Sequence, residues 1–212
     1  MRSSRFLTSG VSSRYCWRAV QLFDSSESLA ESVSAFLAPA YEAGDNLLIV
    51  AKPRHWDAIA LGLKALGCEV VEGLRTERII VLNAAATLRA ISRNDTPEDG
   101  RFDEVVGRLV RDLTRKGGLA IYGEMVEVLA EEGNFAAAVK LEDLWNALAE
   151  RTSFRLMCGY SSAHFAAPAS ERHLHLVCSA HTQVRTKSDD PLGGWLVKRT
   201  RLPFKAELLP VR

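Results

Sequence analysis

The sequence predicts an α/β fold, a three-layer sandwich with a mostly parallel central sheet. The run Asn46–Ala51 is continuously apolar, which is typical of a strand buried on both faces. Trp56, Ile59, Ala60 and Leu63 then recur at helical spacing. The same alternation of strand and helix continues along the chain, and it implies right-handed crossovers with helices on both faces of one sheet. A chain of 212 residues suits one such domain.

The individual elements follow from apolar spacing and from helix-ending residues. Strands are expected at residues 18–23, 46–51, 78–82, 119–122 and 154–158, with 70–71 as a short strand or a connection. Asp24 and Glu27 form a candidate capping box for the first helix, which ends at Gly44. Further helices are expected from Pro53 to Gly67, over 102–113 and over 135–150, with a loop at 94–100.

Composition divides the chain into three parts and bounds its setting. Residues 1–17 are rich in Arg and Ser and poor in acids, which favours a flexible N-terminus over a targeting peptide. Residues 18–184 form the folded domain. Residues 185–212 are a basic C-terminal extension, for which a loose addition, late strands at 195–197 and 204–209 and a partner-binding arm are the alternatives. The net charge of +1 argues against bulk attraction to nucleic acid or membrane.

No apolar run approaches the roughly 20 residues that span a bilayer. The cysteines have apolar surroundings and none lies in a ligand pair, which indicates a reducing, cytoplasmic compartment; they are Cys16, Cys68, Cys158 and Cys178.

The turn after the first strand carries no phosphate-binding loop. Residues 23–28 offer two acids and three serines, without the glycines and the lysine that cradle a nucleotide phosphate. An acidic turn at this place favours a sensory or regulatory module over an ATPase.

Candidate binding residues follow from the rule that ligands of open parallel sheets bind outside the carboxyl ends of the strands. Glu124 directly follows a buried strand and is the strongest candidate to orient a ligand. The alternative role for Glu124 is to stabilise the N-terminus of the helix that follows. Asp24 is a ligand contact or a helix cap. Glu142 either lies at the edge of the apolar stripe of its helix or pairs with an arginine or a ligand. Met125, Trp145 and Tyr160 are expected to form the apolar walls of the site. The predicted ligand-binding set is therefore Asp24, Glu124, Met125, Glu142, Trp145 and Tyr160.

No catalytic or metal site is predicted. The histidines are scattered, and the sequence gives no geometric support for a triad of Cys158, His181 and a distant acid.

Several short motifs occur in a fixed order and together resemble the MEDS family, the methanogen/methylotroph sensory domain. They lie at residues 18–24, 100–103, 123–126, 131–134, 141–146, 158–160 and 181–184. The resemblance implies a MEDS-like sensory domain over 18–184, with a RecA/KaiC-like fold that lacks the phosphate loop. Family members serve as sensory inputs, alone or fused to histidine kinases, regulators or DNA-binding domains, and hydrocarbon derivatives are proposed ligands for some. Relatives often carry a histidine where this chain has Arg18.

The sequence therefore predicts a non-catalytic, cytoplasmic, bacterial sensory or regulatory domain. It is expected to bind a small apolar molecule or a partner at the carboxyl edge of its sheet. It would signal through another protein, a histidine kinase or transcription regulator, without membrane or direct nucleic-acid contact. A homodimer is a further partner that the sequence allows. The sequence identifies no cofactor. The alternatives are a carboxylate-dependent enzyme on a degenerate RecA-like fold and a pure protein-interaction module.

Overall fold

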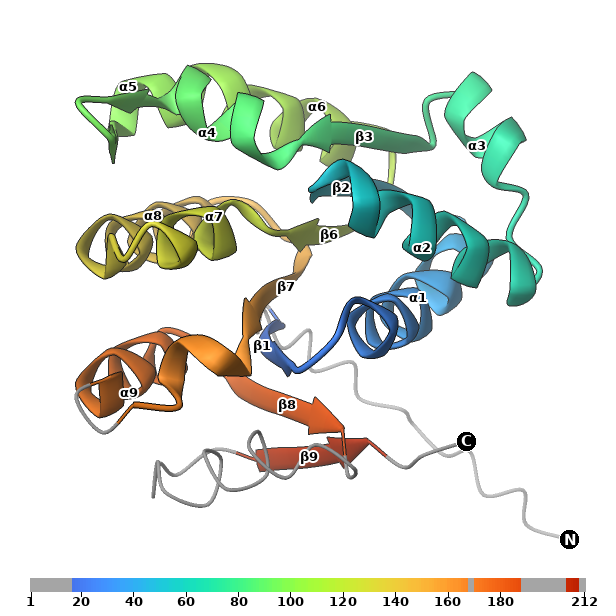
Figure 1. Cartoon of the computed structure of the whole chain (residues 1–212). Coiled ribbons are helices and arrows are strands. Elements are labelled where there is room, and N and C mark those ends of the chain that lie inside the picture. The colour runs from blue at the N-terminus through green and yellow to red at the C-terminus, as the bar shows by residue number, and fades with distance from the viewer. Residues whose placement is uncertain (1–16, 168–169, 188–204, 210–212) are drawn as a thin grey trace, which may run out of the picture.

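A computed structural model describes residues 17–167, 170–187 and 205–209, and it confirms the predicted α/β sandwich. The central sheet has the strand order β3-β2-β6-β7-β1-β8-β9, and its paired strands run parallel. Helices cover both faces of this sheet, with α1, α2 and α3 on one side and α4 to α9 on the other (Figure 1). The strands are β1 Arg18–Phe23, β2 Asn46–Ala51, β3 Ile79–Asn83, β6 Leu119–Gly123, β7 Arg155–Ser161, β8 Gln183–Lys187 and β9 Lys205–Leu209.

The helical layers differ in size. The first face carries α1 Ser26–Glu42, α2 Pro53–Ala65 and α3 Val70–Arg75. The second face carries α4 Ala84–Ile91, α5 Asp99–Phe102, the π-helical turn Asp103–Gly107, α6 Arg108–Lys116, α7 Met125–Glu131, α8 Phe135–Ala149, the 3-10 turn Ser162–Phe165 and α9 Glu171–Ser179. A small antiparallel hairpin, β4 Ser92–Arg93 and β5 Thr96–Pro97, occupies the predicted loop.

Two hydrophobic cores lie on the two faces of the sheet, and the strands supply alternate residues to each. In β2, Leu47 and Ile49 pack with the α1 and α2 side, whereas Leu48 and Val50 pack with the opposite side. All four are fully buried. The apolar run that predicted this strand is therefore explained by burial on both faces.

Several segments differ from the sequence prediction, among them residues 70–71 and the helix α4. Residues 70–71 begin the helix α3, where a short strand or a connection was expected, and Val70 is buried while Val71 is exposed. The β-branched pair prefers a strand locally, but the segment lies outside the sheet, and tertiary placement overrides this weak propensity. The helix α4 was not predicted, although Asn83 caps it by accepting a hydrogen bond from the Ala86 N–H at 2.9 Å.

The capping box predicted for α1 from Asp24 and Glu27 is wrong in its residues. Ser25 is the N-cap: its hydroxyl oxygen accepts the Ser28 N–H at 3.1 Å, and the Ser28 hydroxyl accepts the Ser25 N–H at 3.3 Å. Asp24 instead accepts a hydrogen bond from the Ser28 hydroxyl at 2.7 Å. Only two residues separate β1 from α1, and hydrogen bonds among Asp24, Ser25 and Ser28 cap the helix. The turn therefore forms no phosphate-binding loop.

The chain beyond residue 184 contributes to the sheet. β8 pairs with β1, and the backbone of Lys205–Leu209 pairs with β8 as strand β9. Residues 1–16 and most of the predicted extension, including Trp195, lie outside the described residues.

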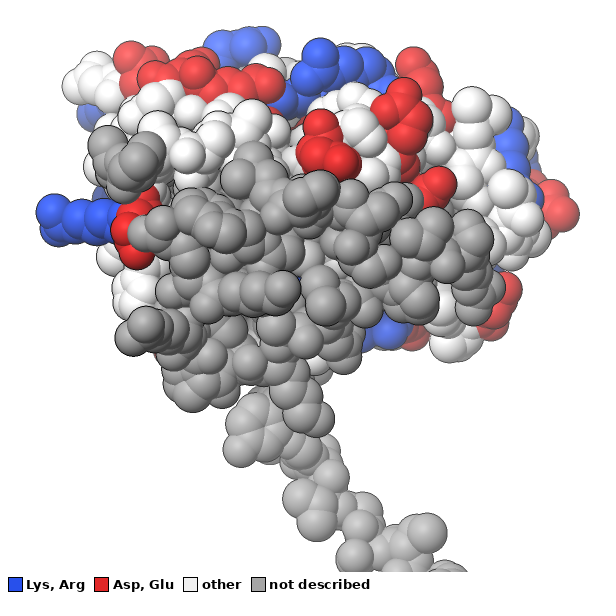
Figure 2. Space-filling view, turned by 60° about the horizontal axis from the view of Figure 1, so that its bottom comes forward, with Lys and Arg blue, Asp and Glu red and all other residues white. Residues whose placement is uncertain are grey.

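Charged side chains of both signs share the surface. Figure 2 shows acidic and basic residues interspersed along the described rim of one face. Exposed ion pairs, such as Glu72 with Arg75 and Glu98 with Arg101, bring both signs together at the surface of the protein. Within the described part of the chain, no helix combines the length and apolarity needed to cross a bilayer.

Candidate functional site

Glu124 lies at the carboxyl edge of the sheet, directly after β6, and its side chain is fully buried. It is the N-cap residue of α7, yet its side chain makes no capping hydrogen bond. One carboxylate oxygen accepts the backbone N–H of Lys52 at 2.7 Å, at the end of β2. The other contacts Nδ1 of His55, in the first turn of α2. Glu124 therefore links the ends of two neighbouring strands to α2.

His55 connects this carboxylate to the start of α1. Its Nε2 lies 3.0 Å from the hydroxyl oxygen of Ser26, the first residue of α1. The ring is buried and meets the edge of Phe23, with ring centroids 5.9 Å apart. A carboxylate only accepts, so a proton on the Glu124 side belongs to Nδ1; in the neutral ring with that tautomer, Nε2 accepts from Ser26. We name Ser26, His55 and Glu124 the edge relay.

A second carboxylate extends the same edge towards β7. Glu127 is buried and accepts the Ser161 N–H at 2.8 Å, at the end of β7. It also lies 3.0 Å from Nε2 of His164, and this hydrogen bond raises the pKa of His164. The Lys52 ammonium is 2.7 Å from Glu131 and 3.8 Å from Glu127. The edge thus carries buried acids whose charges are met by neighbouring groups.

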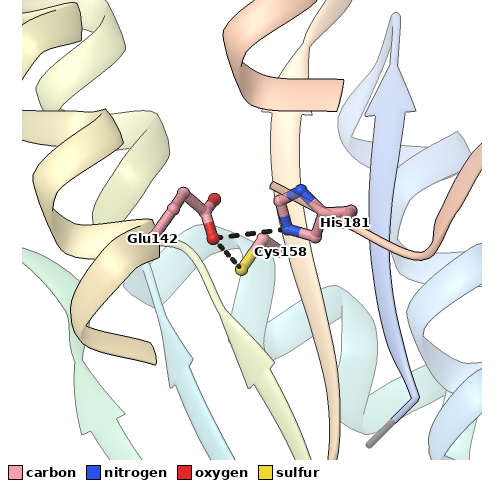
Figure 3. Close-up of side chains that lie close together, drawn as sticks. All are labelled: Glu142, Cys158 and His181. Atoms are coloured by element: carbon pink, nitrogen blue, oxygen red, sulfur yellow. Dashed lines mark hydrogen bonds and ion pairs between the residues drawn. The ribbon is translucent and has the colours of Figure 1, made fainter. Parts of the chain in front are cut away.

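Another polar cluster is enclosed within the second core. Glu142 from α8, Cys158 from β7 and His181 from the segment after α9 point towards one another (Figure 3). The Tyr160 hydroxyl donates to one Glu142 oxygen at 3.1 Å, and the Cys158 thiol donates to the other at 3.5 Å. His181 Nε2 lies 3.3 Å from that second oxygen, at ion-pair distance. We name these four residues the Glu142 cluster, and all of them are buried.

Electrostatics hold the cluster's thiol and phenol in their neutral forms. Burial raises the pKa values of Cys158 and Tyr160 well above their ordinary values, and the Glu142 carboxylate raises them further. Burial alone would lower the pKa of His181, but Glu142 outweighs it and the pKa is raised. The positive charge of Arg18 opposes both the His181 and the Cys158 shifts.

The cluster bears on two possibilities raised by the sequence. Cys158 and His181 do meet an acid, but the thiol donates to Glu142, and a thiol held neutral is a poor nucleophile. The ligand atoms of Glu142, Cys158 and His181 lie within 4.8 Å of one another, and thiolate, imidazole and carboxylate are the donors that Zn²⁺ accepts. The donor set is therefore compatible with a metal. Among the described residues, His181 Nε2 lies 3.3 Å from Glu142 at ion-pair distance but makes no hydrogen bond.

The six sequence-predicted ligand residues fall into separate places. Glu142 and Tyr160 lie together in the Glu142 cluster, whereas Glu124 lies in the edge relay. Asp24 is exposed at the α1 cap. Met125 and Trp145 are buried in the larger core, where Trp145 meets Phe102 edge-on with ring centroids 5.2 Å apart.

Sequence reasoning did not connect either predicted glutamate to its partners. His55 lies just after the second strand, where the carboxyl-edge rule points, but a lone histidine carries no further signal. Ser26 was hidden among neighbouring serines of the same turn. His181 is distant in sequence, and only the fold brings it to Glu142.

An open surface hollow of about 730 Å³ lies elsewhere, between α4, α5 and α8. Charged residues line it, among them Arg93, Glu98 and Lys140, and none of the six predicted ligand residues does. This hollow is therefore distinct from both polar groups described above.

Comparison with known proteins identifies the family of the chain. The model of the MEDS family, the methanogen/methylotroph, DcmR sensory domain, matches residues 19–181. This range holds β1 except its first residue, β2 to β7, the edge relay and the whole Glu142 cluster. No match was found among curated proteins. The chain belongs to the MEDS family of sensory domains.

Proposed function

We propose that this sensory domain recognises a small molecule at the carboxyl edge of its sheet, around Glu124, and reports to another protein. The observation that carries the proposal is the position of Glu124. It is a fully buried carboxylate at the edge where parallel sheets bind ligands, and it holds the end of β2 and the start of α2 together. A ligand that competes for this carboxylate would loosen α2, which gives recognition a structural consequence.

The proposed route of the signal leads outward through α2 and α3. Leu61 of α2 and Val71 of α3 are 68% and 71% exposed, so each of these helices presents a large apolar side chain to solvent. We propose that a signalling protein, a histidine kinase or transcription regulator, reads this face. A cytoplasmic setting agrees with the free, buried thiols of Cys68, Cys158 and Cys178. An acid directly after a buried strand, as Glu124 is after β6, also agrees with the proposed kinship to the RecA/KaiC fold.

Glu124→Gln tests the assignment of the site. The amide keeps the size of the side chain but removes the charge that a ligand would compete for. Thermal unfolding of the purified chain is measured against a panel of short-chain alcohols, aldehydes, amines, esters and halogenated hydrocarbons. A compound that raises the Tm of the parent is expected to lose its effect on Glu124→Gln, because binding to the folded state is what raises the Tm.

Glu132→Gln is the matched control, because Glu132 is an exposed acid at the end of α7. It should respond as the parent does, and circular dichroism should show all three proteins folded. A ligand response that survives unchanged in folded Glu124→Gln would contradict this site.

A further inference from the structure

We propose that the edge relay is a nucleophilic site, in which Ser26 takes an acyl group from a small uncharged carboxylic ester. The inference goes beyond the proposed sensory function and does not rest on it. It also departs from the sequence-based expectation of a non-catalytic domain, since the serine, histidine and acid become visible together only in the fold.

The three side chains stand in the order that activates a serine. The Ser26 hydroxyl lies 3.0 Å from His55 Nε2, and His55 Nδ1 contacts Glu124. The second oxygen of Glu124 accepts the Lys52 N–H at 2.7 Å, which fixes the carboxylate against the ring. A base that reaches the nucleophile and is itself oriented by a buried acid is the arrangement of serine hydrolases, and it recurs on unrelated folds.

The Ser26 hydroxyl takes no part in the capping hydrogen bonds that its serine neighbours make. Ser25 and Ser28 cap α1 by exchanging hydrogen bonds with each other. The hydroxyl of Ser26 instead faces His55, and its side chain is partly exposed at the surface, while His55 and Glu124 are buried. An accessible nucleophile above a buried base and acid is what attack on an external substrate requires.

The start of α1 supplies donors for the charge that develops during such an attack. The N–H groups of Ser26 and Glu27 lie in the first turn of a 17-residue helix, where the helix itself offers them no carbonyl partner. In hydrolases with a serine on a strand-to-helix turn, the N–H of the residue after the serine helps to bind the oxyanion. Glu27 is that residue here, and the helix dipole has the matching sign.

The proposed reaction is ordinary acyl transfer. The Ser26 oxygen attacks the ester carbonyl carbon while His55 Nε2 takes the hydroxyl proton. The tetrahedral intermediate collapses, the bond to the leaving alcohol breaks, and His55 returns the proton to the alcohol oxygen. Water then attacks the acyl-serine with His55 again as the base, which releases the carboxylic acid and restores Ser26. Glu124 acts as a positioning residue for His55.

Charges around Ser26 favour an uncharged substrate. Asp24 and Glu27 are exposed acids on either side of the serine. The cations that follow β2, Lys52 and Arg54, both lie at ion-pair distance from Glu131. The two exposed acids would therefore repel a phosphate or carboxylate group on a substrate that approaches Ser26.

The test is covalent labelling of the full chain with a fluorophosphonate, located by peptide mass spectrometry, together with hydrolysis of p-nitrophenyl acetate. Label is expected on Ser26. Ser26→Ala should remove it, and His55→Gln should slow labelling and hydrolysis by about 100-fold or more, the usual contribution of a general base. Glu124→Gln should lower kcat for p-nitrophenyl acetate with little change in KM, which a role limited to folding would not produce.

Ser153→Ala is the control, because Ser153 is exposed in the connection between α8 and β7, and it should label as the parent does. Circular dichroism confirms that each variant is folded. A folded parent whose Ser26 stays unlabelled overturns the proposal. Label that persists in Ser26→Ala, or that is independent of His55, overturns it as well.

Discussion

Glu142→Ala is expected to lower the free energy of unfolding by about 3–5 kcal/mol, the usual cost of removing one partner from a buried ion pair. Glu142 accepts hydrogen bonds from Tyr160 and Cys158 and lies 3.3 Å from His181 Nε2. Its removal leaves three buried polar groups without their common acceptor, and water does not reach them. Urea unfolding followed by circular dichroism measures the loss.

The same variant should change the pH dependence of stability. Glu142 raises the pKa of His181 in the folded state above its ordinary value of 6.5. A raised folded-state pKa stabilises the fold fully below the unfolded pKa, and this contribution is lost as the pH rises through the folded pKa. Cys158 and Tyr160 have pKa values raised well above their ordinary values and stay neutral in this range. The penalty of Glu142→Ala should therefore be largest near and below pH 6.5 and smaller in alkaline solution.

Asp143→Ala is the control for both measurements, because Asp143 is the next residue of α8 and is exposed. It should change stability by no more than about 0.5 kcal/mol, as exposed substitutions usually do. If Glu142→Ala is as stable as Asp143→Ala, or its penalty grows with pH, the description of the Glu142 cluster is wrong.

Gly159→Ala is expected to destabilise the fold by about 1–3 kcal/mol, the range for overfilling a packed core. A Cβ at this position would lie 2.7 Å from the Tyr122 hydroxyl oxygen and 3.3 Å from a carbon of its ring. Tyr122 is fully buried, and Gly159 lies between Cys158 and Tyr160 in β7. The strand or the tyrosine must shift, and a shift of the strand would disturb the Glu142 cluster. The midpoint of urea unfolding reports the cost.

Gly123→Ala is the matched control in the neighbouring strand. Gly123 pairs with Cys158 in the sheet, and a Cβ there would meet its nearest atom at 3.9 Å, an ordinary contact. The Gly123 variant should remain close to the parent in stability. If both glycine variants lose the same stability, the contact with Tyr122 is not the reason that position 159 requires glycine.

Much of the fold could be predicted from the sequence because local pattern reports burial. The run Asn46–Ala51 is buried on both faces and was predicted as a whole strand. The segment 70–71 was misread because two adjacent valines favour a strand locally, while their place outside the sheet decides for a helix. The cap of α1 was misassigned by one residue, since Asp24 and Ser25 both suit a cap and only backbone geometry separates them.

The polar sites could be predicted only in part. The carboxyl-edge rule located Glu124, because an acid directly after a buried strand is visible in the sequence. The contact of Ser26 with His55 depends on the packing of α1 against α2, since β1 and β2 are separated in the sheet by β7 and β6. Apolar spacing places Trp145 on an inward helix face, but it does not distinguish a core position from the wall of a ligand site.

Equilibrium binding of Mg·ATP, with phosphate release measured on the same sample, tests most directly whether this edge is a recognition site without nucleotide chemistry. The two-residue turn after β1 holds its own cap, offers no lysine and carries the exposed acid Asp24. We expect neither magnesium-dependent binding nor phosphate release by the purified chain. Tight magnesium-dependent binding with turnover, abolished by Glu124→Gln, would contradict this expectation.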